Sequence, residues 1–420
     1  MDKKTIIKAA IIALTAMSFT CAQAQDTGVL EKVRSNPALA RGYYYVNPNG
    51  AQRQSKAPKG YKPFYISHFA RHGARYCWED VYTRLDTTLR NAHDEGKLTP
   101  KGEELYRTFH PWAEQLSRHT GELVRKGWDQ HACSARNIVN AFPEVFAKGA
   151  SVSATSSDVD RCEMSMASYC LELCRQRPEM PIYEYVSITD FDAVRPTARE
   201  WPGLFPVQTV PNPFGDRRPT TANPASDVVG QYFTDLSWVE SNFGTDDMCE
   251  DLYTLWCCLQ CADEPVEMDN PFTPEQEAAN FQRGCYDAFV HDTKYKYESW
   301  PVAADIVEKA EARIASGERG ADLRFSHDSH FGPLYVLLDI DGGGTVAPSP
   351  DEQYQYFQTY DICKATNLHF VLYRSRKSPD ILFKLLLNGV ETTLPLEPVE
   401  GPYYRWDDFK ALVNSLDPRK

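Results

Sequence analysis

The residues with the clearest chemical potential are five consecutive ones at the end of an apolar run: Arg71-His72-Gly73-Ala74-Arg75. Each arginine offers a planar fork of donors that matches phosphoryl oxygens, and its charge does not titrate. A neutral histidine between them could attack phosphorus and carry the phosphoryl group covalently. We expect Gly73 to let the chain turn directly after the histidine. The alternative is a basic strand end on the surface, but such a pattern arises by chance in about one chain in a thousand.

A second polar cluster, His327-Asp328-Ser329-His330, follows another strand-like run, Leu323-Arg324-Phe325-Ser326. Ligands of α/β sheets collect at the carboxyl ends of strands, so both clusters would face one crevice if their strands are neighbours. Asp328 could then give a proton to a departing alkoxide, and His327 could donate to phosphoryl oxygens. The alternative is a plain strand-to-helix connection with Asp328 as the N-cap. His330 is predicted to be structural, as is His68 in the first strand, because no chemical step requires them.

A third candidate lies between these two clusters. A short strand ends near Ser156 and Ser157, and Arg161 follows at the start of the next helix. An arginine on that first turn could point back over the sheet end towards the same phosphate. By itself the signal is weak, because arginines on first helical turns are common.

The rest of the chain alternates strand and helix patterns at its two ends. Strands are predicted at 64–71, 151–156, 322–326, 368–374 and 380–387. Helices are predicted at 99–112, 129–146, 160–175, 227–243, 246–262, from 273 onwards and at 301–315. Two of the helices have clear starts, Thr99-Pro100 and the capping box Thr273-Pro274-Glu275-Gln276. The order of these elements predicts the α/β class with a mainly parallel sheet and flanking helices.

Composition narrows the class of function. The chain has 420 residues, more than one average domain, and its 42% hydrophobic and 25% charged residues are those of a globular protein. The net charge of −13 argues against sequence-independent binding of nucleic acid, which relies on clustered lysine and arginine. An anionic small molecule would therefore need positive charge gathered in a cleft, as residues 71–75 would provide.

The N-terminus predicts export. Basic residues at positions 3, 4 and 8 precede an apolar stretch, 9–20, which is too short for a membrane helix. Ala22-Gln23-Ala24 is a small-x-small cleavage signal, so we assign residues 1–24 to a signal peptide. The product would be periplasmic or surface-associated, and no later stretch has the length of a membrane span. Cys21 offers a lipoprotein alternative, but the preceding Thr20 is larger than the usual residue there.

The remaining eleven cysteines do not form a recognisable framework. Cys257-Cys258-x-x-Cys261 could be read as part of a zinc site, but no second ligand pair lies at a suitable spacing. We expect these thiols to be small buried hydrophobes. The sequence therefore predicts no metal and no cofactor.

Taken together, the chain resembles the histidine acid phosphatases, the branch of the histidine phosphatase superfamily with RHGxR near the N-terminus and HD or HAE towards the C-terminus. The matching positions are Arg71-His72-Gly73-Ala74-Arg75, the passage Ser156 to Arg161, and His327-Asp328; Leu98-Thr99-Pro100-x-Gly102 and Gly127-x-x-Gln130-His131 are softer landmarks.

The resemblance implies a role for each matched residue. His72 would be the nucleophile, and Asp328 would protonate the leaving alcohol of a small phosphate monoester. Arg71, Arg75, Arg161 and His327 would bind the transferring phosphoryl group. The arginines would take the electrostatic part that magnesium plays elsewhere, so no metal is implied.

The resemblance also implies a fold with an α-helical cap domain inserted into the α/β core. We expect the core at 25–165 and 301–420, and a mostly helical cap at 166–300. The segment 197–224 is rich in proline and glycine and interrupts the alternation of strand and helix patterns, which fits such an insertion.

Within the family, the chain looks most like the multiple inositol polyphosphate phosphatases and phytases. Two features depart from that group: His327-Asp328-Ser329 stands where His-Ala-Glu is usual, and Glu79 and Asp80 follow the motif where phytases often have a lysine. A broad-specificity acid or sugar-phosphate phosphatase is therefore the alternative. A non-catalytic phosphate-ester binding protein would be expected to lose the nucleophile or the acid. Mutases of the superfamily tend to carry glutamate where Ala74 and Arg75 stand.

Overall fold

The computed structural model describes residues 28–47, 50, 53–78, 80–186, 194, 208–262 and 264–420. The predicted signal peptide, with Cys21, and Glu79 lie outside the described residues. Within them, every helix falls short of the combined length and apolarity that crossing a membrane requires.

An eight-stranded sheet forms the centre of the larger lobe, in the order β3-β2-β4-β1-β5-β6-β7, with β8 paired to β6. The strands are β1 (Tyr61–Arg71), β2 (Ala150–Ser156), β3 (Ile182–Val186), β4 (Arg319–Ser326), β5 (Asn367–Ser375), β6 (Leu382–Leu387), β7 (Val390–Thr392) and β8 (Tyr404–Arg405). The pairs β3–β2, β2–β4 and β4–β1 are parallel, whereas β5 is antiparallel to β1 and to β6. The predicted α/β class, with parallel strands at its centre, is confirmed.

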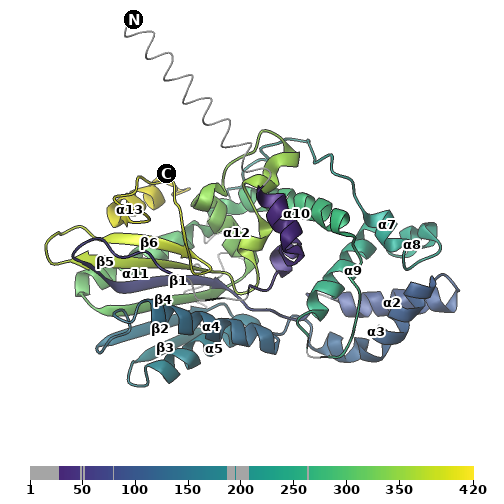
Figure 1. Ribbon diagram of the computed structural model, residues 1–420, viewed down its shortest axis with the longest axis horizontal. Helices are drawn as coiled ribbons and strands as arrows, with labels where there is room; N and C mark the ends of the chain where they lie inside the picture. Colours follow the sequence, from purple (N-terminus) through teal and green to yellow (C-terminus); the bar gives the residue numbers. More distant parts are fainter. Residues whose placement is uncertain are drawn as a thin grey trace, which may run out of the picture.

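Helices cover both faces of this sheet (Figure 1). On one face lie α4 (Arg125–Ala141) and α5 (Asp160–Gln176), and on the other α11 (Trp300–Ser316), α12 (Asp328–Leu337) and α13 (Trp406–Ser415). Ile66 and Ala70 of β1 pack with the first group, while Tyr65 and Phe69 pack with the second. Burial on both faces explains why β1 reads as a nearly continuous apolar run.

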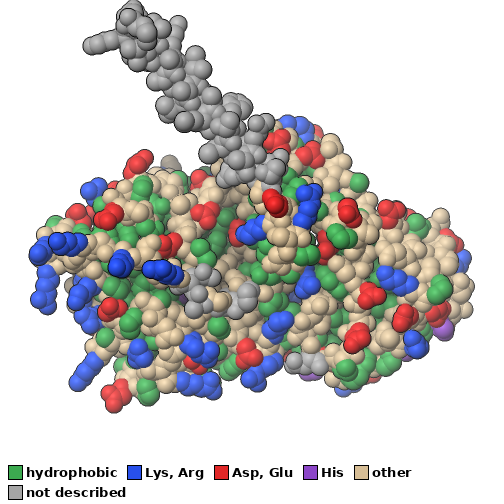
Figure 2. Space-filling view, viewed as in Figure 1, with side chains coloured by type: hydrophobic (Ala, Val, Ile, Leu, Met, Phe, Trp, Pro, Cys, Tyr) green, Lys and Arg blue, Asp and Glu red, His purple; other side chains and the backbone are tan. Residues whose placement is uncertain are grey.

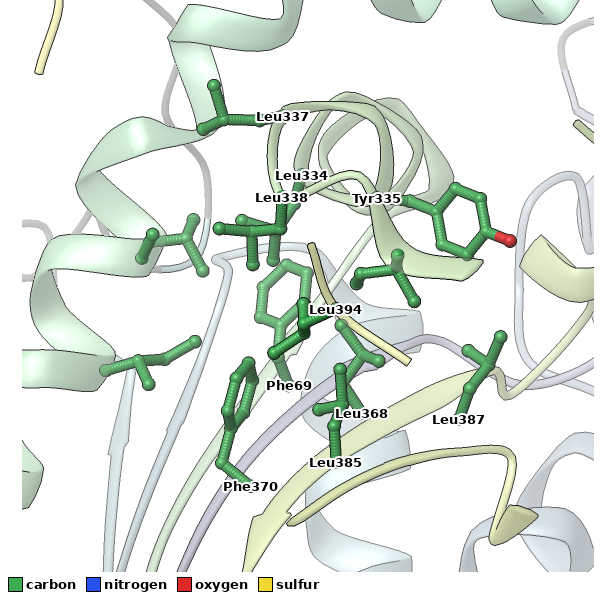
Figure 3. Packing of buried hydrophobic residues seen from close by; sticks show 14 of the residues in the cluster. Phe69, Leu334, Tyr335, Leu337, Leu338, Leu368, Phe370, Leu385, Leu387 and Leu394 are labelled. Carbon is green, nitrogen blue, oxygen red and sulfur yellow. The ribbon is translucent and has the colours of Figure 1, made fainter. Parts of the chain in front are cut away.

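The second face holds α12 in place (Figure 3). Phe69 of β1 and Leu368 of β5 lie beneath Leu334 and Leu338 of the α12 segment, and all four side chains are fully buried. Each fully buried leucine or phenylalanine contributes about 1.5–3 kcal/mol relative to exposure. This packing fixes the first turn of α12 at the end of β4, where Asp328 lies.

The smaller lobe is helical and lies beside the sheet (Figure 1). It contains α2 (Val81–Asp94), α3 (Pro100–Arg118), α7 (Ala225–Val229), α8 (Leu236–Asn242) and α9 (Thr245–Leu259), and α10 (Pro274–Tyr295) runs between the lobes. Short 3-10 helices complete the fold at Pro37–Tyr44, Lys296–Ser299, Ile340–Gly342, Pro350–Gln355 and Thr359–Ile362. The predicted starts of α3 at Thr99 and of α10 at Thr273 are confirmed, because both threonines accept the expected backbone hydrogen bonds.

This packing differs from a single cap at 166–300 in two places. Helix α5 continues through residue 166 and packs on the sheet, which β3 also joins. Helices α2 and α3 share one apolar cluster with α7 and α9. Periodicity shows that a helix has an apolar face but not which partner covers it. We therefore propose a cap built from two stretches, 81–118 and 225–272.

Candidate active site

The two polar clusters meet because β1 and β4 are neighbours. Arg71, the last residue of β1, is in register with Ser326, the last of β4. The backbone N–H of His72 donates to the carbonyl of Ser326 at 2.9 Å. The rings of His72 and His327 lie 5.6 Å apart between centroids. The structure thus brings together the two strand ends that the sequence marks.

His72 has the tautomer that a nucleophile needs. Its Nδ1 lies 2.9 Å from the carbonyl oxygen of Gly73, which can only accept, so Nδ1 carries the hydrogen. The lone pair is therefore on Nε2. The side chain is buried, and burial lowers its pKa well below the usual range, as do the charges of Lys364, Arg71 and Arg75. His72 therefore stays a neutral imidazole to lower pH than an ordinary histidine does.

Arg71 is anchored through both terminal nitrogens of its guanidinium and keeps a donor at Nε that is unpaired among the described residues. Its Nη1 donates to the carbonyls of Tyr43 and Ile362, both at 2.7 Å. Its Nη2 donates to Asp328 at 2.6 Å. Its buried Nε has no hydrogen-bond partner among the described residues. A fixed guanidinium with an unused donor is suited to an anionic ligand.

Arg75 and Arg161 lie near each other, because Trp78 lies against both. The Trp78 ring centroid is 5.7 Å from the Arg75 guanidinium carbon and 4.8 Å from that of Arg161. Both arginines are buried, and the Nε of each has no partner among the described residues, as in Arg71. Trp78 is 49% exposed, so it forms the rim of this basic group. The three arginines of the sequence motifs therefore gather around His72.

His327 is held by protein contacts at both ring nitrogens. Nη2 of Arg161 donates to Nδ1 at 3.2 Å, and Nε2 lies 3.0 Å from the Ser157 hydroxyl. A guanidinium can only donate, so Nδ1 accepts and Nε2 carries the hydrogen. In this arrangement His327 aligns Arg161. Donation from His327 to a phosphoryl oxygen, as the sequence suggests, would require a change in one of these contacts.

Asp328 is the first residue of α12 and the most exposed of the predicted site residues, with 32% of its side chain accessible. The N-cap of the helix is His327, so Asp328 does not have the plain capping role. Burial raises the pKa of its carboxyl, but Arg71, Lys364 and Arg75 more than offset this, and the net shift is downwards. The Arg71 ion pair therefore keeps Asp328 ionised until another anion competes for Arg71.

The loop after β1 is clamped by α4. A Cβ at Gly73 would lie 2.5 Å from the carbonyl oxygen of Gly127, and one at Gly127 would lie 2.2 Å from that of Ala74. The chain bends directly after Gly73, at Ala74. Gly73 has no left-handed φ, so glycine is required there for the close approach of two backbones. Gln130 accepts from the Ala74 N–H at 3.0 Å, and His131 hydrogen-bonds the Arg71 backbone. These contacts explain the Gly127-x-x-Gln130-His131 landmark.

His68, His330 and the cysteines at 257–261 are the remaining residues that the sequence singled out. His68 is buried against the rings of Tyr169, Phe325 and His369, and both its ring nitrogens lack hydrogen-bond partners among the described residues, so its role is structural. The His330 ring lies 5.9 Å from that of His327. Cys257, Cys258 and Cys261 are buried. In the part of the chain that the structure describes, no three His, Cys, Asp or Glu side chains are grouped as a metal site.

Two residues beside the site were missed by sequence reasoning. Trp78 could have been noticed as an aromatic residue three positions after Arg75. Lys364 is buried near His72 and Arg71, and no pattern around it in the sequence marks it.

Comparison with known proteins places the fold. No protein-family model and no curated protein sequence matches the chain. Among solved structures, the apo form of the multiple inositol polyphosphate phosphatase of Bifidobacterium longum aligns with a TM-score of 0.68 and 18% identity, over 90% of this chain and 97% of that one. Its complex with phosphate gives a TM-score of 0.67 at 18% identity, over 90% and 98% of the two chains.

The phytase of D. castellii aligns with a TM-score of 0.59 and 13% identity, over 91% of this chain and 85% of that one. At such identities the likeness concerns the fold. The chain therefore has the fold of these phosphatases, which confirms the fold expected from the resemblance to the histidine acid phosphatases.

Proposed function

We propose that this protein is an exported phosphomonoesterase of the histidine acid phosphatase type, which transfers the phosphoryl group of its substrate to His72. One observation carries the proposal: neighbouring strand ends place a neutral imidazole, with its Nε2 lone pair free, among three arginines and beside Asp328. Buried donors without partners on those arginines support an anion as the ligand.

The reaction would have two steps. Nε2 of His72 attacks phosphorus, the bond to the ester oxygen breaks, and Asp328 gives its proton to the departing alkoxide. A water molecule then attacks the phosphohistidine, Asp328 takes a proton from it, and the N–P bond breaks to release phosphate. Arg71, Arg75 and Arg161 stabilise the charge on the equatorial oxygens in both steps.

The first substrate class to test is inositol polyphosphates, because the Bifidobacterium longum phosphatase with the same fold has been solved in complex with inositol hexasulfate. A second substrate class, sugars with one phosphate, is favoured by the residues that line a cleft of about 790 Å³ beside Trp78. Asp80, Asp247 and Asp251 line it, and Asp251 is paired with Arg84. Carboxylates there would repel the outer phosphates of a hexakisphosphate, so sugars with one phosphate are the alternative.

Phosphate release from a panel tests the proposal. Purified protein should hydrolyse an aryl phosphate together with phytate, a sugar monophosphate, or both, and a chelator should leave the rates unchanged. Preference for the sugar phosphate over phytate would indicate that the carboxylates of this cleft determine the substrate specificity. Absence of phosphate release from every ester would contradict the proposal. Sequencing of the secreted protein, with Gln25 expected first, tests export.

The rate should pass through a maximum on the acid side of neutrality. Towards low pH it falls only when His72 is protonated, and burial with four nearby cations holds its pKa well below the ordinary value. Towards high pH the rate falls because the proton that Asp328 must give to the alkoxide is no longer supplied. The Arg71 ion pair keeps Asp328 ionised before substrate binds, so this proton comes from a substrate monoanion, whose own pKa is about 6. Steady-state rates between acidic and alkaline pH check this, and an alkaline optimum would contradict it.

A further inference from the structure

Lys364 is held beside the loop that carries His72. Its backbone N–H donates to the carbonyl of Tyr45 at 2.9 Å, and the N–H of the next residue, Ala365, donates to the carbonyl of His72 at 3.0 Å. Nε2 of Gln130 donates to the Lys364 carbonyl at 3.1 Å, and the same side chain accepts from Ala74. The position of Lys364 is therefore coupled to the residues 71–75.

The side chain of Lys364 is buried without a polar partner. It is 3% exposed, and its Nζ makes no hydrogen bond to any described residue. Nζ lies 5.1 Å from the centroid of the Tyr44 ring. Lys384, the other fully buried lysine among the described residues, donates instead to Glu391 at 2.7 Å. An ammonium that is buried without an acceptor is costly, so Lys364 needs an explanation beyond packing.

Groups of both signs of charge act on Lys364. Burial lowers the pKa of its ammonium well below the usual range, and Arg71 and Arg75 lower it further, while Asp328 and the Cys258 thiol oppose them. After burial, Lys364 is the largest cause of the low pKa of His72. The charges of Lys364, Arg71 and Arg75 thus act on one another and on His72. A phosphate dianion bound beside His72 would accept hydrogen bonds from the lysine and from both arginines at once.

We propose that Lys364 is a further phosphate-binding residue, whose ammonium contacts the transferring phosphoryl group beside Arg71 and Arg75. This inference rests on the proposed function. In the reaction, the ammonium adds a compact point charge to the planar forks of the arginines. It also helps to keep His72 neutral. A bound dianion would raise the pKa of Lys364 again, because it opposes the arginines.

The rival explanation is a structural ion pair with Cys258 of α9. A hydrogen bond with Cys77 and the charges of Arg75 and Lys364 together lower the pKa of the Cys258 thiol to about 7, against the effect of burial. A thiolate there would be a permanent counter-ion for Lys364. The two explanations predict different effects on the stability of the protein. Removal of the Lys364 charge would destabilise the fold if Lys364 pairs with Cys258, whereas under our proposal it would not.

The test replaces Lys364 by methionine, which keeps the length of the side chain and removes its charge. Inhibition of aryl phosphate hydrolysis by inorganic phosphate should weaken by about 10- to 100-fold, the usual range for hydrogen bonds to charged groups. The ratio kcat/KM should fall by a similar factor. The melting temperature in phosphate-free buffer should stay the same or rise, while its increase on addition of phosphate should largely disappear.

Lys384→Met is the matched control, because it removes an equally buried lysine that has an acid partner away from His72. It should lower the melting temperature and leave phosphate inhibition unchanged. Inhibition by phosphate that stays within about twofold in Lys364→Met would overturn the inference. A lower melting temperature with unchanged inhibition would favour the Cys258 pair. Lys364→Gln replaces the methionine variant if the latter does not fold, and failure of both would show that the charge is structural. If the wild-type protein neither hydrolyses esters nor binds phosphate, the proposed function itself fails.

Discussion

Replacement of His72 by alanine should lower turnover by about four to six orders of magnitude, as removal of a nucleophile does in other enzymes with covalent intermediates. The lone pair of Nε2 is the only nucleophile that the site offers in our account, and the arginines cannot replace it. The imidazole donates one hydrogen bond, to the Gly73 carbonyl, so its loss should leave the fold intact. Initial rates with an aryl phosphate, together with circular dichroism, measure both effects.

His68→Leu is the matched control for this variant. His68 lies on the same strand, is buried, and uses neither ring nitrogen in a hydrogen bond to the described residues. An apolar replacement should therefore keep most of the activity. Substantial activity in His72→Ala, or an equal loss in both variants, would remove His72 from the role of nucleophile.

Asp328→Asn should separate substrates by their leaving groups. Alkyl phosphates should lose about 10²- to 10⁴-fold in kcat, because their alkoxides need a proton. A nitrophenyl phosphate should lose far less, since its leaving group is stable as an anion. Asparagine retains a carbonyl oxygen that can accept from Arg71, so phosphate binding should change little. Steady-state kinetics on both classes of ester provide the comparison.

Asp292→Asn and Arg161→Ala are the controls for the leaving-group effect. Asp292 is a buried carboxylate that accepts from the Tyr43 hydroxyl, and in our account it takes no part in proton transfer. Arg161 would contact the phosphoryl group whichever alcohol leaves. Any losses in these two variants should therefore be equal for alkyl and aryl esters. Equal losses in Asp328→Asn as well would exclude Asp328 as the proton donor.

Much of the fold could be predicted because local signals agree with the tertiary structure. The apolar run before Arg71 is a central strand, and the caps at Thr99 and Thr273 start helices. Helix α2 was missed because its threonines and β-branched residues favour helix weakly; packing against α3 decides its form. The helix predicted at 227–243 is broken, because Asp235 caps a new helix by accepting from the Trp238 N–H.

The site residues could be predicted only where the residues with suitable chemistry are adjacent in the sequence. The segments around His72 and His327 each show a strand that ends in a polar cluster, and the register of β1 with β4 brings them together. Lys364 carries no such signal, since it reaches the site through the pairing of its segment with Tyr45. The close approach of Gly73 to Gly127 could not be predicted, because it is a long-range contact.

The central claim is that His72 carries the phosphoryl group, and trapping of that intermediate tests it most directly. Wild-type protein mixed with labelled substrate and quenched in alkaline denaturant should retain label that is stable in base and lost in acid. Peptide mapping should place the label on His72, and His72→Ala should carry none. Label on another residue, or hydrolysis without a trapped intermediate in the wild-type protein, would contradict the account.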